Sequence, residues 1–108
     1  RLLARSGKVV SIERSMVPYW PQLANVPLSG LTGGSLSATL TEAGLLAASG
    51  EEWAEVARLE NEDAALMGAA PAAAVLRTRR LVRDHEGRVI EYVVSLLDPD
   101  YFALHLEY

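Results

Sequence analysis

The most constraining feature of this 108-residue chain is a pair of β-rich stretches separated by a tight turn. Val75–Arg83 and Arg88–Leu97 are rich in valine, leucine and isoleucine, and branched residues of this kind favour extended backbone. Between them stands Asp84-His85-Glu86-Gly87, a segment with strong turn chemistry. The pattern predicts a β-hairpin, and with it an antiparallel sheet.

The symmetry of this turn would decide which side chains face each other across the hairpin. A turn symmetric about residues 84–87 sets Arg80 opposite Glu91. Glu91 stands in an otherwise apolar strand, and a carboxylate on a half-buried face needs a partner. Two interpretations remain open for it, a structural salt bridge with Arg80 or contact with a ligand. Glu13, in another apolar strand, has no such ready partner and could simply face solvent.

An earlier strand and a long loop follow the turn at Ser6-Gly7. Residues 9–17 alternate between two faces, which is the period of a strand. Prolines then prevent regular ladder pairing, and the chain continues without periodicity as far as Gly33-Gly34. Long loops of this kind are often binding loops. We therefore expect Tyr19 and Trp20, the large side chains of the loop, to border a pocket together with the segment Gly30–Ser35.

Two helices are predicted from their caps and apolar spacing. Ser35 begins the first, because its hydroxyl can cap free amides and leucines recur behind it at helical spacing. Asn61, followed by two acids, begins the second, which Gly68 ends. That start makes Trp53 to Leu59 a strand, and a last strand is expected over residues 101–108.

The length and composition fit one folded domain over residues 1–108, and the predicted hairpin and helices place it in the α+β class, with an antiparallel β-sheet. Half of the residues are hydrophobic (50%), which argues against disorder. No apolar run approaches the roughly 20 residues that cross a bilayer, so no membrane partner is expected. The absence of cysteine excludes disulfides and thiolate metal sites.

The charge of the chain argues against nucleic-acid binding by this chain alone. Its net charge is −4, which repels phosphate backbones unless the cations are sharply clustered. On a strand Arg77, Arg79 and Arg83 share one side, while Arg80 faces the other. A solvated sheet face is therefore favoured over a nucleic-acid surface.

Catalytic and metal chemistry have little support in the sequence. Histidine occurs only at His85, in a turn, and at His105, so no base–nucleophile arrangement can be argued. No His, Asp and Glu set has metal-ligand spacing, and we expect no catalytic residue, metal or cofactor. Gly33-Gly34-Ser35 is a candidate anion site, since amides converge where a helix begins. The alternative is an ordinary loop that ends in a capping serine.

These pieces, taken together, resemble the UTRA domain, the C-terminal module of HutC-type GntR transcription regulators. No single motif is specific, but their order and spacing over nearly the whole chain are. The motifs are Gly-Lys-Val-Val-Ser-Ile-Glu-Arg-Ser from Gly7 to Ser15, then Pro18, Gly34-Ser35-Leu36, Ala64-Ala65-Leu66-Met67-Gly68, Val75-Leu76-Arg77-Thr78-Arg79-Arg80, Asp84-His85-Glu86-Gly87-Arg88 and Ile90-Glu91-Tyr92.

The resemblance implies a chorismate-lyase-like fold and a homodimer in a cytoplasmic bacterial regulator, here expected to be a repressor, that binds a small-molecule metabolite effector. Family effectors include sugar phosphates and amino-acid catabolites. In such regulators a winged helix-turn-helix domain precedes the UTRA domain and contacts DNA. This chain begins at Arg1, directly in strand-like sequence, as expected of a fragment from which that domain is absent.

The resemblance also implies which residues contact the effector. In sugar-phosphate-binding members the contacting positions correspond to Arg1, Leu3, Glu13, Ser35 and Glu91 of this chain. With the loop, the helix start and the hairpin included, the candidate effector site comprises Arg1, Glu13, Tyr19, Gly34, Ser35, Arg80 and Glu91. Leu3 replaces an arginine of those members, and Asp98 stands where the family often has another. Both departures point towards a less anionic effector.

Two other functions remain open beside the leading hypothesis of an effector sensor. One is a lyase of chorismate-lyase type, an enzyme class whose dicarboxylate substrate needs a strongly cationic pocket. Leu3 removes a cation from such a pocket. The other is a dimerisation module whose pocket is vestigial, which Leu3 and Asp98 make harder to dismiss.

Overall fold

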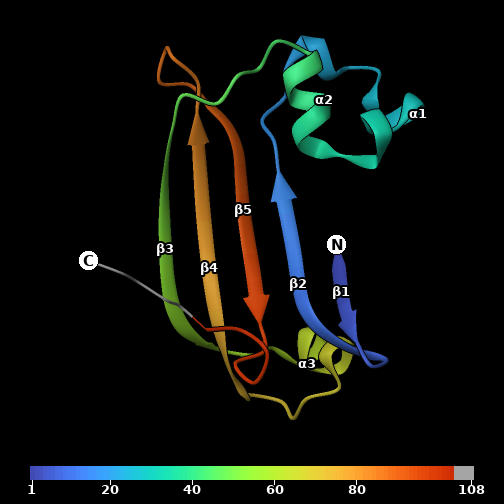
Figure 1. Ribbon diagram of the computed structural model, residues 1–108, viewed down its shortest axis with the longest axis vertical. Helices are drawn as coiled ribbons and strands as arrows, with labels where there is room; N and C mark the ends of the chain where they lie inside the picture. The colour runs from blue at the N-terminus through green and yellow to red at the C-terminus, as the bar shows by residue number, and fades with distance from the viewer. Residues whose placement is uncertain (104–108) are drawn as a thin grey trace. The chain divides into compact units, whose positions relative to one another are not determined.

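The computed structural model describes residues 1–103, which form a five-stranded sheet in the order β1-β2-β5-β4-β3 (Figure 1). The strand β1 pairs antiparallel with β2, and the arrows of β2, β5 and β4 alternate in direction. The predicted α+β class, an antiparallel sheet with helices, is confirmed. The elements are β1 (Leu2–Arg5), β2 (Lys8–Met16), α1 (Val26–Ser29), α2 (Leu36–Glu42), β3 (Ser49–Arg58), α3 (Asn61–Met67), β4 (Ala74–Arg83) and β5 (Val89–Leu97).

The strand expected over residues 101–108 falls largely outside the described residues, and Tyr101 itself lies in a turn. The strand predicted between Trp53 and Leu59 is confirmed as part of β3, which begins earlier, at Ser49.

The predicted hairpin of β4 and β5 forms, but its turn is not symmetric. Asp84 N donates to Arg88 O at 2.9 Å, and Gly87 N donates to Asp84 O at 3.1 Å. Gly87 has φ +79°, the left-handed conformation of a glycine bulge. Asp84 Oδ1 holds the turn by accepting from Glu86 N and Arg88 N, each at 2.9 Å. The bulge displaces the pairing beside the turn by one residue, so the predicted symmetric register is wrong there.

The chain divides into two compact units, each with its own apolar cluster. The first, here called the α3 unit, contains Arg1–Ser15, Glu52–Arg79 and the chain from Val93 onward. The second, the α2 unit, contains Met16–Glu51 and Arg80–Tyr92. Both units draw on β4 and β5, so the hairpin supplies residues to each cluster.

In the α3 unit, the helix α3 packs Ala64 and Met67 into a cluster completed by Ile12, Leu59, Val75 and Leu96. The helix begins at Asn61, as predicted, but its N-cap is the preceding residue and not Asn61 itself. Glu60 is extended (ψ 161°) and is the N-cap, while Asn61 is already helical. Gly68 ends the helix in the left-handed conformation, as predicted. Burial of these side chains, and not the polar cap, therefore fixes where α3 lies.

In the α2 unit, α2 contributes Leu40 to a cluster with Leu45, Val82 and Ile90. Trp20, Leu23, Leu36 and Ala43 pack against it while partly exposed. Ile90 is almost fully buried, at 2% exposure. The cluster is small because much of the unit is loop, and loops bury little apolar surface.

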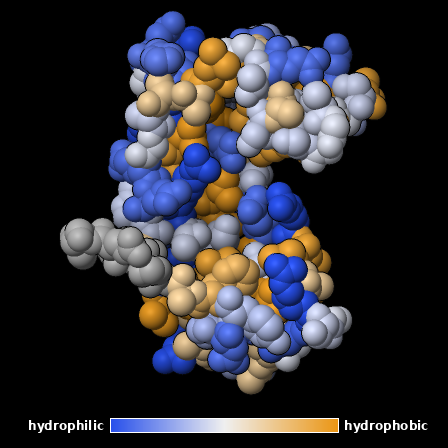
Figure 2. Space-filling model, in the orientation of Figure 1, coloured by the Kyte–Doolittle hydropathy of each residue, from blue (hydrophilic) through white to orange (hydrophobic). Residues whose placement is uncertain are grey.

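Some large apolar side chains remain in contact with water. Leu28, Tyr19 and Val56 are 92%, 81% and 75% exposed. Figure 2 shows hydrophobic patches among the hydrophilic side chains of the visible face. Among the described residues, no helix combines the length and the apolar character needed to cross a membrane.

Asp98, at the end of β5, is a structural carboxylate of the α3 unit. It is 7% exposed, accepts a hydrogen bond from Asp100 N at 2.9 Å, and lies 3.1 Å from Lys8 Nζ. The Asp100 amide first, and then Lys8, hold the pKa of this carboxyl below its ordinary value despite burial. Lys8 therefore balances its negative charge, so the expectation that Asp98 makes the pocket less suited to an anion is not supported.

Replacing Asp98 by asparagine tests this arrangement, because it keeps the shape and removes the charge. The free energy of unfolding should fall by about 1–2 kcal/mol at neutral pH. A lowered folded-state pKa contributes stability above the unfolded value of about 3.9, and that stability is lost as the pH falls through the folded value. The difference between wild type and Asp98→Asn should therefore shrink in acid, as measured by urea unfolding from neutral pH down to about pH 3.

Asp100→Asn is the matched control, since it removes a neighbouring exposed charge and keeps the donating amide. Asp100→Asn should lower the free energy of unfolding by less than Asp98→Asn does at neutral pH. If Asp98→Asn loses the same unfolding free energy at every pH, the electrostatic role of Asp98 is contradicted.

Candidate functional site

The start of α2 is built as the sequence predicts. Ser35 is the N-cap, with extended backbone, and its Oγ accepts from Ala38 N at 3.1 Å. Gly34 has φ +73°, which an L side chain would strain. Thr39 Oγ1 donates to Ser35 O at 2.7 Å and secures the first turn. The hydroxyl of Ser35 thus already serves the helix, while the residue itself remains exposed.

The loop before α2 is more ordered than predicted. It contains two short 3-10 turns, Pro21–Leu23 and Thr32–Gly34, in addition to α1. Prolines stand in the first turn of Pro21–Leu23 and of α1, where their fixed φ favours helical backbone and no amide is needed. The sequence analysis uses the prolines only to exclude strand pairing and does not predict that they favour short helical turns.

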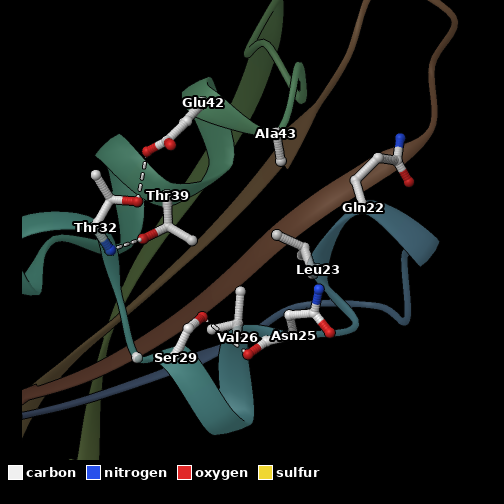
Figure 3. A pocket seen from close by; sticks show the side chains of 10 residues that line it. Gln22, Leu23, Asn25, Val26, Ser29, Thr32, Thr39, Glu42 and Ala43 are labelled. Carbon is white, nitrogen blue, oxygen red and sulfur yellow. Dashed lines mark hydrogen bonds between the residues drawn. The ribbon is translucent and has the colours of Figure 1, made fainter.

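A polar hollow of about 250 Å³ lies within the α2 unit, between this loop and α2 (Figure 3). Thr32 N donates to Thr39 Oγ1 at 2.8 Å, and Thr32 Oγ1 donates to Glu42 Oε2 at 2.7 Å. Its lining contains amides, hydroxyls and a carboxylate but no arginine or lysine. The lining residues are Gln22, Leu23, Asn25, Val26, Ser29, Gly30, Thr32, Thr39, Glu42 and Ala43.

Gly30 and Thr32 of this lining lie in the segment Gly30–Ser35, which was expected to border a pocket. Sequence reasoning did not name the other lining residues, although one signal was available for Thr39. Thr39 follows the capping Ser35 by four residues, which is the spacing that brings side chains together on a helix. None of the lining residues was among the predicted site residues.

A second, smaller hollow of about 100 Å³ brings together two predicted site residues, Arg80 and Glu91. Polar residues of α2, Ser37 and Thr41, line it as well. Within residues 1–103, the carboxylate of Glu91 forms no hydrogen bond or ion pair, so the considered salt bridge to Arg80 does not form. The symmetric turn on which that interpretation rested is also not observed, since the pairing beside the turn is displaced by one residue.

The two loop aromatics differ in their surroundings. Trp20 packs against the cluster of the α2 unit, and the guanidinium of Arg88 lies 5.1 Å from the centre of its ring. Its Nε1 is buried and has no hydrogen-bond partner among the described residues. Tyr19 is 81% exposed and covers nothing within its unit. Of the two side chains, the tryptophan packs against the apolar cluster, whereas the tyrosine is largely exposed.

Arg1 and Glu13 lie together in the α3 unit through their backbones. Arg1 N donates to Glu13 O, and Glu13 N donates to Arg1 O, each at 2.8 Å. The Glu13 side chain is half-buried and, within residues 1–103, has no ion pair. Leu3 pairs with Ser11 and is 37% exposed. The predicted site residues thus form two groups, one in each unit.

A charged cluster on β3 and β4 was not predicted as a site. Arg77 and Arg79 both approach Glu55, and Arg79 also lies over the ring of Trp53. The arginines were expected on a solvated face, whereas their side chains are only 41% and 36% exposed. The alternation of Trp53 and Glu55, matched by that of the two arginines, was the available signal.

The sequence profile of the UTRA domain family matches residues 1–103. No curated protein sequence matches the chain significantly. Among solved structures, the C-terminal domain of YurK from Bacillus subtilis has a TM-score of 0.85 at 11% identity, covering 99% of this chain and 73% of that one.

Two further structures are similar. The effector domain of PhnF from Mycobacterium smegmatis has a TM-score of 0.81 at 21% identity, over 97% of this chain and 67% of that one. A GntR-family transcriptional regulator from Enterococcus faecalis has a TM-score of 0.77 at 16% identity, over 99% of this chain and 76% of that one. At such identities these structures establish the fold, and the profile match spans nearly the whole chain. The chain therefore belongs to the UTRA domain family.

Proposed function

We propose that the chain is the effector-binding and dimerisation domain of a bacterial GntR-type transcription regulator of the HutC subfamily. It binds a small metabolite and contacts DNA only through a winged helix-turn-helix domain outside this sequence. The observation that carries the proposal is the UTRA profile match over residues 1–103. The antiparallel sheet, whose likeness to an effector domain extends over 97% of the chain, supports it.

The proposed effector contacts are the predicted site residues, and each group is considered within its own unit. In the α2 unit, Gly34 and Ser35 present exposed backbone at the start of α2, and Arg80 and Glu91 line a hollow beside that helix. Glu91 supports the proposal most directly, because its carboxylate has no ion pair among the described residues and is open to a ligand donor. Tyr19 is a further proposed contact of the α2 unit, and Arg1 and Glu13 are proposed contacts within the α3 unit.

The proposed mechanism uses the loop before α2 as the responsive element. The loop is held on α2 by hydrogen bonds of Thr32 to Thr39 and Glu42, and it carries little buried surface. An effector that orders this loop would shift the geometry of a homodimer and so change DNA affinity. Such coupling between sites is typically about 1–3 kcal/mol. We propose further that the regulator is cytoplasmic and acts as a repressor.

We propose no enzymatic activity for the chain. The lyase hypothesis required a strongly cationic pocket, and no arginine or lysine lines the larger hollow of the α2 unit. The vestigial-pocket hypothesis is tested by a thermal-shift screen of metabolites, because a dimerisation module without a working site should gain no stability from any of them.

The isolated chain should not bind DNA. Its net charge of −4 opposes approach to phosphates, and its arginines are partly neutralised by carboxylates. Fluorescence anisotropy with a labelled duplex, at about 50 and 200 mM salt, should show no saturable change. A full-length regulator that contains this chain is the positive control. Saturable binding by the chain alone that weakens with salt would contradict the prediction.

Glu91→Gln should weaken binding of the effector identified by such a screen by about tenfold, the scale of a lost charge-assisted hydrogen bond. Stability should change by less than about 0.5 kcal/mol, because no ion pair is broken. Calorimetric titration and urea unfolding measure the two quantities.

The matched control is Glu51→Gln, which makes the same charge change at an exposed position of the α2 unit and should leave effector affinity unchanged. Unaltered affinity together with a large loss of stability in Glu91→Gln would make Glu91 a structural residue.

Hydrogen exchange tests the responsive loop. Amide exchange in residues 22–36 should slow when that effector is added, because the loop becomes ordered at the site. Amides of α3 provide the internal reference and should keep their rates. Protection confined to segments other than 22–36 would place the site elsewhere.

A further inference from the structure

The strands β3 and β4 place Trp53, Glu55, Arg77 and Arg79 in one cluster of the α3 unit, here called the arginine–tryptophan cluster. One residue separates the two members on each strand, so each pair shares one face of its strand. Figure 1 shows β3 and β4 side by side at the edge of the sheet.

The charges of the cluster do not balance. Arg77 approaches Glu55 Oε1 through Nε and Nη2, each at 3.0 Å, and Arg79 Nε lies 3.2 Å from the same oxygen. One carboxylate therefore faces two guanidinium groups, and one positive charge is in excess. The three side chains are 36–41% exposed, so a ligand can reach them.

The guanidinium of Arg79 is held in place while its two Nη groups stay free to bind a ligand. It lies 5.0 Å from the centre of the Trp53 ring, a cation–π arrangement that fixes its plane. Nε is buried and its N–H does not point at Glu55, so that contact is Coulombic and not a hydrogen bond. Neither Nη group of Arg79 has a hydrogen-bond partner within residues 1–103. These two groups form the fork that binds planar oxyanions through two parallel hydrogen bonds.

We propose that the arginine–tryptophan cluster is a binding site for an oxyanion group, carboxylate or phosphate, held by the Nη edge of Arg79 and the excess charge shared with Arg77. The inference goes beyond the proposed function, because this oxyanion site lies entirely within the α3 unit. Glu55 competes with the ligand for both arginines and keeps their side chains in place when the site is empty.

The test is a titration of the ¹⁵N-labelled chain with inorganic phosphate and, separately, with acetate, followed by NMR at the arginine Nε–H and tryptophan indole N–H signals. Saturable shifts are expected at Arg79 and Trp53. The anion with the higher affinity identifies the chemical class of the group. Arg79→Gln should lower the affinity at least tenfold, and Arg79→Lys, which keeps the charge without the fork, by a smaller factor.

The control variant is Arg58→Gln, which makes the same charge change in the same unit, where Arg58 donates only to Ala72 O at 3.4 Å. Its anion affinity should stay within about twofold of wild type. Glu55→Gln should act in the opposite direction and raise the affinity severalfold, because it removes the competing carboxylate. This variant keeps the test decisive even if Arg79→Gln fails to fold.

Three results would overturn the inference. One is the absence of saturable shifts with both anions, and another is an affinity unchanged by Arg79→Gln in a folded chain. The third is a set of shifts confined to other residues, such as the start of α2. None of these would remove the proposed function, which fails separately if no metabolite stabilises the chain or slows exchange in residues 22–36.

Discussion

The pairing of β4 with β5 is the constraint on which both apolar clusters depend. Val75 and Leu96 enter the cluster of the α3 unit, while Val82 and Ile90 enter that of the α2 unit. Ladder hydrogen bonds fix which side chains of a hairpin lie next to each other, and each helix then packs where apolar groups are presented. The bulge at Gly87 displaces the pairing beside the turn by one residue.

Charge pairing distinguishes the arginine–tryptophan cluster from the other cations of this acidic chain. Lys8 pairs with Asp98 and Arg14 with Asp63, so each of these cations has a carboxylate of its own. Arg88 has two acidic neighbours. Arg77 and Arg79 instead share a single carboxylate. Local excess charge of this kind is set by neighbours in space, so a net charge of −4 does not exclude an oxyanion site.

The candidate site could be predicted only in part. The helix start at Ser35 follows from a short capping signal, and the structure has it at that residue. Arg80 and Glu91 line one hollow, but the ion pair considered for them does not form, and the symmetric turn that suggested it is replaced by a glycine bulge. Of the polar hollow, the loop residues Gly30 and Thr32 lie in the segment expected to border a pocket, whereas the contribution of Thr39 and Glu42 from α2 was not anticipated.

The sequence by itself determined the local elements: the hairpin, the strand β2, and the helices that end at glycines. Periodicity, turn chemistry and caps act over a few residues, so they can be read along the chain. Tertiary structure decided the pairing of Arg77 with Glu55, which are 22 positions apart, and of Arg14 with Asp63, which are 49 apart. It also decided that Asp98 is neutralised by Lys8. Such contacts depend on which strands become neighbours and in what register, and no short stretch of sequence specifies that geometry.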